Sequence, residues 1–504
     1  MNDRSGNRLP ILRLAALTVA ALAIHGYHLG VDDGEIYIPA AKRLLNPNLY
    51  PFATEFFLSH AHLSLFSPAL AATAKLTHLS MDWTVLAWYV ATVFGMLISC
   101  WMVAKACFES PRAWWTAILV MTAVLAMPAT NTGLLLMDPY LTARSFSTPL
   151  TLFALASILE HKYLRAAVAV LLTATVHPQM VAYLIFLVGV MWLMERKTTS
   201  KHQSSPIMAS LVLALPGGFH LAPAGEPYRE ALYSRDFYFL STWAWYHWLG
   251  MLAPLAFLAW CWKANLRGTR PAFARLSFAM IPFGLFSIAV ALVFSSSHSF
   301  DMFARLQPLR TFHLITIVFV LLLSGVLGEF VAKRRPWVVP AITLPLAAGM
   351  FLVAFETYPL SPHVEWPSTT STNAWVNTLL WVRNSTPQDA VFAVDSRYFL
   401  EPGVDEHGFR AVSERSALPD YYKDGGVVAI FPALAVEWKQ MSSATYGLNH
   451  FSEAQFRDLK RKYPQVTWTA IHGPAPAGMD CPCQQRSYSV CRMPALPSSA
   501  GPQL

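Results

Sequence analysis

The sequence predicts a polytopic α-helical membrane protein with a small α/β domain after its last span. Three observations lead to this fold class. Of the 504 residues, 55% are hydrophobic and only 13% are charged, whereas a soluble globular domain carries about 25% charged residues. The mean hydropathy is +0.39, and several apolar runs reach the roughly 20 residues that cross about 30 Å of hydrocarbon. After about residue 358, amphipathic and alternating patterns replace the apolar runs.

The net charge of +8 reflects membrane topology and does not indicate a nucleic-acid partner. Basic residues gather in short loops such as "KANLRGTR" and "AKRRP", which the positive-inside rule places in the cytoplasm. The rule puts the N-terminus inside and the outer loops at residues 30–82, 129–146, 224–243 and 296–310. The N-terminal apolar run lacks a clean small-x-small cleavage site, so we expect a retained first helix of a membrane domain over residues 1–357.

Length and hydropathy place the membrane spans. We expect them at roughly 11–29, 83–107, 113–128, 146–160, 207–223, 244–262, 276–294, 311–332 and 338–355. The apolar stretch 63–79 must start and end outside, so we expect an interfacial or partly embedded helix there.

The segment 166–194 has basic residues on both flanks, "HKYLR" and "ERKTTSKHQ", so it must enter the membrane and return. Because proline breaks a helix, His177-Pro178 divides it into two halves. A hairpin tip inside the membrane has to face protein or a water-filled cavity, so we expect a cavity that opens to the outer side. With this hairpin counted twice, the chain crosses about eleven times.

Residues 358–492 form the predicted extracytoplasmic α/β domain. "NAWVNTLLWVRNS" and "SEAQFRDLKRKY" have the pattern of helices, whereas "AVFAV" and "QVTWTAIHG" have that of strands. Residues 493–504 are expected to be a disordered tail. Since disulfides persist outside the cytoplasm, we expect Cys481 or Cys483 to pair with Cys491, with a zinc site as the weaker alternative.

Ionisable residues in the outer loops form the candidate site. A carboxylate can accept the proton of an acceptor hydroxyl, and arginine binds phosphate with two hydrogen bonds and stabilises charge on a leaving group. Taken singly, each charge is more often an anchor for a helix end in the membrane interface, and it is their combination that indicates a site. The candidate catalytic carboxylates are Asp32, Asp33 and Glu35, and Asp138 is an accessory candidate. The candidate phosphate-binding residues are Arg144, Arg305 and Arg310.

Two histidines are accessory candidates. His177 stands at the tip of the broken hairpin, where a packed, hydrogen-bonded histidine and a functional one are equally expected. His313 follows the fourth outer loop, 296–310. The aromatic residues at 243–248 could stack on a sugar, but an interfacial aromatic belt is the default explanation.

The chain resembles the GT-C superfamily of membrane glycosyltransferases, which use polyprenyl-phosphate-linked sugars. The motifs are "VDDGEIYIP" after the first helix and "MDPY" in the next outer loop, and "WVRNSTPQDAVFAV", "FRAVSERS" and "EWKQM" resemble the tail domain of uncharacterised bacterial members. The resemblance implies an inverting transferase in the bacterial inner (cytoplasmic) membrane, with its C-terminal domain in the periplasm. It would move a sugar from a polyprenyl-phosphate donor to an envelope glycan, lipid or protein acceptor.

In such an enzyme the acid of the first outer loop would be the catalytic base or a metal ligand. We favour Asp33 over Asp32 because the following Gly34 lets the backbone turn. Asp33 with Asp138 could hold Mg²⁺ or Mn²⁺ through oxygen ligands, and we expect the two carboxylates within about 15 Å of each other, the length of ten helical residues.

Two other functions compete with the transferase. A transporter or flippase for a lipid-linked saccharide would carry ionisable groups near the membrane midplane and an internal repeat. The sequence instead has charges at the outer ends of spans and no evident repeat, which favours the enzyme. A non-catalytic membrane scaffold whose outer domain binds a partner is the third hypothesis.

Overall fold

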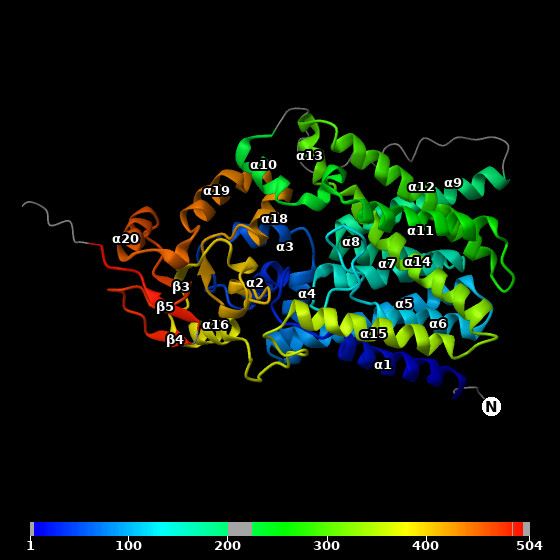
Figure 1. Cartoon of the computed structure of the whole chain (residues 1–504), viewed down its shortest axis with the longest axis horizontal. Coiled ribbons are helices and arrows are strands. Elements are labelled where there is room, and N and C mark those ends of the chain that lie inside the picture. Colours follow the sequence, from blue (N-terminus) through cyan, green and yellow to red (C-terminus); the bar gives the residue numbers. More distant parts are fainter. Residues whose placement is uncertain (1–4, 200–223, 486, 497–504) are drawn as a thin grey trace, which may run out of the picture. The chain divides into compact units, whose positions relative to one another are not determined.

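The computed structural model describes residues 5–199, 224–485 and 487–496, and it is mostly helical with one small C-terminal sheet (Figure 1). The chain divides into two compact units. Unit 1 comprises the described residues up to Gly26, those of Ala87–Gly225, and Arg235–Ala354. Unit 2 comprises Tyr27–Leu86, Glu226–Ser234 and the described residues from Phe355 onward. The predicted helical class and the C-terminal sheet are confirmed.

Unit 1 is a bundle of apolar helices, in which α6 packs on α14, α7 on α8, and α11 on α12. Its helices are α1 (Ser5–His25), α5 (Met81–Cys107, whose first residues belong to unit 2), α6 (Pro111–Ala123), α7 (Ala143–Leu159), α8 (Tyr163–Val176), α9 (Pro178–Thr199), α11 (Trp245–Lys263), α12 (Pro271–Phe294), α13 (Asp301–Ala304), α14 (Thr311–Val326) and α15 (Val338–Thr357), which ends in unit 2.

Four helices in the described part of the chain are long and apolar enough to cross a membrane. They are Met81–Cys107, Pro271–Phe294, Pro308–Val331 and Val338–Thr357. Shorter apolar helices cover Leu9–His25, Ala143–Leu159, Tyr163–Val176 and Pro178–Leu193. The predicted count of about eleven crossings is therefore not confirmed, and the predicted span at 207–223 lies outside the described residues.

The predicted helix break at His177-Pro178 is present. α8 ends at Val176, His177 has extended φ and ψ of −150° and 89°, and α9 starts at Pro178. Proline is tolerated at the first position of a helix because its missing N–H would have no intrahelical partner there. His177 Nδ1 accepts a 3.4 Å hydrogen bond from the backbone N–H of Met180, so the side chain helps to start α9.

Unit 2 contains a five-stranded mixed sheet in the order β2-β1-β3-β5-β4. β1 (Val391–Ala393) pairs in parallel with β2 (Ser416–Ala417) and β3 (Trp468–His472), whereas β5 (Tyr488–Arg492) pairs antiparallel with β3 and β4 (Cys483–Gln485). α16 (Ala374–Ser385) packs on β4 and β5 (Figure 1). Its N-cap is Asn373, whose side-chain oxygen accepts hydrogen bonds from two backbone N–H groups of the first turn.

A disulfide joins Cys481 to Cys491, which is one of the two predicted pairings, and Cys483 is a buried free thiol. The other helices of the C-terminal segment are α17 (Phe409–Ser413), α18 (Lys423–Ile430), α19 (Ala435–Ala444) and α20 (Glu453–Lys462).

The first outer loop folds as part of the same unit as the C-terminal domain. It forms α2 (Gly34–Leu45), α3 (Glu55–Ala61) and α4 (Phe66–Thr77), and α10 (Glu226–Tyr233) joins them. Ile36 and Ala40 of α2, Phe57 of α3 and Val427 of α18 share one buried apolar cluster. Unit 2 is thus larger than the predicted 358–492 domain, because the loop helices bury their apolar faces against C-terminal helices.

Candidate functional site

The acidic motif occupies a tight turn immediately before α2. Gly30 and Asp32 have positive φ values of 73° and 50°. For a residue with a side chain this region is unfavourable by roughly 1–2 kcal/mol. Two backbone hydrogen bonds hold the turn: Asp32 N–H donates to the Glu406 carbonyl at 3.0 Å, and Gly408 N–H donates to the Gly30 carbonyl at 2.9 Å. The C-terminal segment around residue 407 therefore fixes the conformation of the motif.

Asp32 and Asp33 share one cation, Lys423, the first residue of α18. Lys423 Nζ forms an ion pair with the Asp32 carboxylate and lies 3.4 Å from Oδ1 of Asp33. The Lys423 side chain is buried, whereas those of Asp32 and Asp33 are 21% and 30% exposed. Burial lowers the pKa of Lys423, and two adjacent carboxylates favour its charged form. The result is a pair of accessible carboxylates held by a buried ammonium group.

Glu406 belongs to this group, and the sequence analysis missed it. Burial raises the pKa of Glu406; the nearby His407 opposes this effect, and the carboxylates of Asp33 and Asp405 add to it. Glu406 also has a positive φ of 59°. Two carboxyl groups whose surroundings differ in this way are a common arrangement for general acid and base catalysis. The signal in the sequence was "GVDEHG", an acidic pair between glycines.

Glu35, two residues after Asp33, has a different environment. Its side chain is 1% exposed. The carboxylate accepts hydrogen bonds from the backbone N–H groups of Arg410 and Ala411, at 2.9 and 2.8 Å, and from Arg410 Nε at 2.8 Å. These N–H groups belong to the first turn of α17, where no intrahelical acceptor exists. Glu35 therefore fastens α2 to α17, and its predicted catalytic role stays a prediction.

Arg410 links Glu35 to a second pair of buried acids. Its Nη2 donates to Asp424 at 2.6 Å and lies 3.7 Å from Asp420. Burial, together with the neighbouring Asp424 carboxylate, raises the pKa of Asp420. The hollow beside these groups holds about 10 Å³, enough for about one water. No substrate group of useful size fits there.

In unit 1, Asp138 pairs with Arg144. Arg144 Nη2 donates to Asp138 Oδ2 at 2.6 Å, and both side chains are buried. Arg144 lies in the first turn of α7, which Thr142 and Ser145 start with reciprocal capping hydrogen bonds. His313 is buried nearby, and its Nε2 is 3.1 Å from the Leu136 carbonyl oxygen. Three predicted site residues are thus close together in the bundle.

The other predicted arginines lie on the segment before α14. The Arg310 guanidinium lies 5.8 Å from the centre of the Phe237 ring. Within the described residues, Arg310 Nε is buried without a hydrogen-bond partner. Arg305 directly follows α13 and is partly buried. An unsatisfied guanidinium N–H is suited to an anionic ligand.

The predicted metal site between Asp33 and Asp138 stays a prediction, because the two residues belong to different units. The expected distance of less than about 15 Å between the two carboxylates is untested for the same reason. Across the residues that the structure describes, no group of three or more His, Cys, Asp or Glu side chains is arranged to hold a metal ion.

No protein-family model matches the sequence, and no curated protein is significantly similar to it.

Proposed function

We propose that this protein is a membrane glycosyltransferase that moves a sugar from a polyprenyl-phosphate donor to a hydroxyl acceptor. The observation that carries the proposal is the arrangement at the start of α2. Asp33 is partly exposed, is held by Lys423 and has Glu406 as a neighbour with a raised pKa. Such perturbed, clustered ionisable groups are typical of catalytic sites.

In this reaction Asp33 takes the proton from the acceptor hydroxyl. The acceptor oxygen attacks the anomeric carbon, and the bond from that carbon to the phosphate oxygen breaks with its electron pair. The products are the glycosylated acceptor, with inverted configuration, and polyprenyl phosphate. A positioned base contributes about 10²- to 10⁴-fold to the rate of such a step.

The donor phosphate needs positive charge at headgroup depth, and Arg310 is our main candidate for supplying it. Its buried, unsatisfied Nε supports this assignment. Arg144 already has a carboxylate partner, so it would have to exchange Asp138 for phosphate. Arginine suits this role because its planar guanidinium can bind phosphate with two parallel hydrogen bonds.

A deletion strain tests the proposal. We expect mass spectrometry of its envelope glycans and glycolipids to show one species that lacks a sugar residue. The wild-type gene should restore that residue, and Asp33→Asn should not. Asp458→Asn is the matched control, because Asp458 is an exposed carboxylate on α20. Unchanged envelope glycans in the deletion strain, or full rescue by Asp33→Asn, would refute the proposal.

A further inference from the structure

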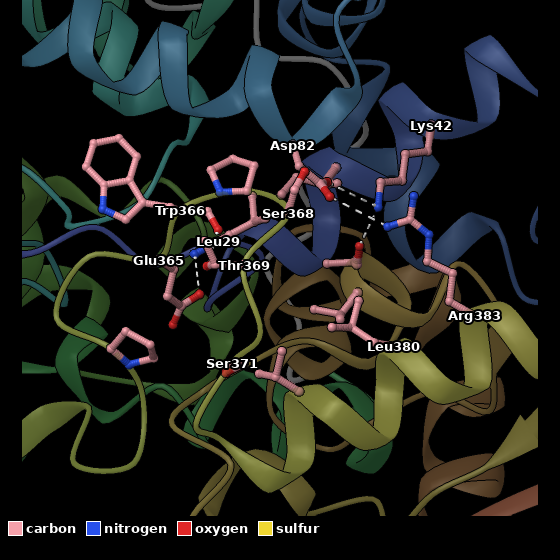
Figure 2. A pocket seen from close by; sticks show the side chains of 16 residues that line it. Leu29, Lys42, Asp82, Glu365, Trp366, Ser368, Thr369, Ser371, Leu380 and Arg383 are labelled. Atoms are coloured by element: carbon pink, nitrogen blue, oxygen red, sulfur yellow. Dashed lines mark hydrogen bonds and ion pairs between the residues drawn. The ribbon is translucent and has the colours of Figure 1, made fainter.

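A second pocket in unit 2 is separate from the Asp32–Asp33 turn. Its walls come from the C-terminal half of α2, the first residues of α5, the loop 362–371, and α16. Figure 2 shows Lys42 and Arg383 on one side and Glu365 and Trp366 on the other. None of these side chains has a part in the proposed transfer reaction.

The charged end of the pocket is electrically balanced. Lys42 Nζ lies 2.9 Å from Glu414 and 3.8 Å from Asp82. Arg383 lies 2.8 Å from the same Glu414 and 3.6 Å from the same Asp82. The two cations are thus already matched by two carboxylates. A phosphate or sulfate entering here would have to displace Asp82 or Glu414 from the two cations, whereas hydroxyl groups could donate to Asp82 and accept from Arg383.

The opposite end combines a fixed carboxylate with an exposed aromatic ring. Glu365 accepts hydrogen bonds from the backbone N–H of Leu29 at 3.0 Å and pairs with His28 and His407. Trp366 follows it, lines the pocket and is 53% exposed. Ser368 and Thr369 add hydroxyl groups to the same wall. An exposed indole offers a flat apolar face while its N–H stays available for a hydrogen bond.

We propose that this pocket binds an uncharged saccharide unit. The C–H face of a pyranose ring would lie on Trp366, and its hydroxyl groups would hydrogen-bond with Asp82, Arg383 and the hydroxyls of the loop. The cavity volume is about 80 Å³, which has room for several waters or a hydroxymethyl group, whereas a polyprenyl chain does not fit.

α2 connects this pocket to the acidic turn. Asp33 precedes the helix and Lys42 lies nine residues further on, which corresponds to about 13 Å along the helix axis. The Glu35–Arg410 pair holds the helix between them. A glycan chain bound in the pocket could therefore reach toward Asp33. The binding itself does not rest on the proposed transferase, because it is an equilibrium property of the pocket.

Isothermal titration of the purified full-length protein in detergent tests the inference. The probes are the methyl glycosides of glucose, galactose, mannose and N-acetylglucosamine, with inorganic phosphate as the anionic comparison. We expect at least one glycoside to bind and phosphate not to compete with it. Trp366→Ala should weaken that binding about tenfold or more, and Trp366→Phe should keep most of it, because a ring remains.

Trp337→Ala is the matched control, since Trp337 is also exposed but is not among the residues that line the pocket. A second variant, Leu380→Trp, fills the hollow from α16 and should abolish binding while thermal unfolding stays cooperative. The inference is wrong if no glycoside binds the wild-type protein, if Trp366→Ala and Leu380→Trp leave binding unchanged, or if phosphate displaces the bound glycoside. If the protein binds a glycoside but transfers no sugar, the proposed function is refuted and the inference about the pocket stands.

Discussion

Asp33 and Glu35 are two residues apart, yet their carboxylates have opposite environments. Asp33 is 30% exposed beside Lys423, at the point where α2 begins. Glu35 is 1% exposed and accepts hydrogen bonds from Arg410 and from the backbone of α17. The comparison shows that two carboxylates of one acidic motif can have different roles. One carboxylate fixes the helix to its support, so that the other can be presented at a defined position.

The largest expected effect is a loss of stability when the buried carboxylate of Glu35 loses its cation. Arg410→Ala leaves Glu35 and Asp424 buried without their cation, and breaking a buried pair in this way costs about 3–5 kcal/mol. We expect the free energy of unfolding, measured with denaturant on the purified protein, to fall by that amount. Arg457→Ala is the control, because its ion pair with Glu453 is exposed and is worth about 1 kcal/mol or less. Equal effects of the two variants would show that Glu35 has no special structural role.

Removing the disulfide should change the stability by an intermediate amount, while Asp33 and Glu35 keep their surroundings. Cys481 and Cys491 are 10 residues apart, and closing a loop of this length stabilises a protein by about 2.7 kcal/mol in the chain-entropy model. Cys481→Ser should lower the free energy of unfolding by about this amount. The variant should also be insensitive to dithiothreitol, whereas the wild-type protein should lose stability on reduction. Loss of stability without this change in sensitivity would contradict the assignment.

In unit 1, Arg310 allows the same distinction between a functional and a structural charged residue to be tested. Arg310→Lys keeps the positive charge but removes the planar fork that binds phosphate with two hydrogen bonds. We expect turnover with a polyprenyl-phosphate sugar to fall about tenfold, equivalent to about 1.4 kcal/mol, with unchanged membrane insertion. A lysine variant as active as the parent would make Arg310 an interfacial anchor.

The smallest expected effect is the pH dependence of the stability that a third carboxylate, Glu365, contributes through its pair with His407. Burial alone would lower the pKa of His407, but the Glu365 carboxylate raises it above its ordinary value of 6.5. The stabilisation from this charged pair is therefore full below about pH 6.5 and is lost as the pH rises through the raised pKa. His407→Gln should lower the free energy of unfolding more at pH 5.5 than at pH 9. An equal cost at both pH values, measured by denaturant unfolding, would contradict the pairing.

Hydropathy and local patterns predicted the elements of this fold well. The predicted spans at 83–107 and 338–355 correspond to α5 and α15, and the break at His177-Pro178 follows from a single proline. These features depend on neighbouring residues only. The pairing of Glu35 with Arg410 spans 375 residues, so no local pattern could indicate it. The same reason explains why the first outer loop was not predicted to join the C-terminal domain.

The most direct test of the central claim is sugar transfer by the purified protein in lipid nanodiscs, with the Asp33→Asn and Glu35→Gln variants compared side by side. Both changes remove a negative charge and keep the size of the side chain. We expect Asp33→Asn to unfold at the wild-type temperature. Its rate of sugar transfer should be lower than that of the wild-type protein by about 100-fold or more, since it lacks a base. Glu35→Gln should unfold at a lower temperature and keep transfer activity wherever it is folded. An Asp33→Asn protein with wild-type activity would contradict the account.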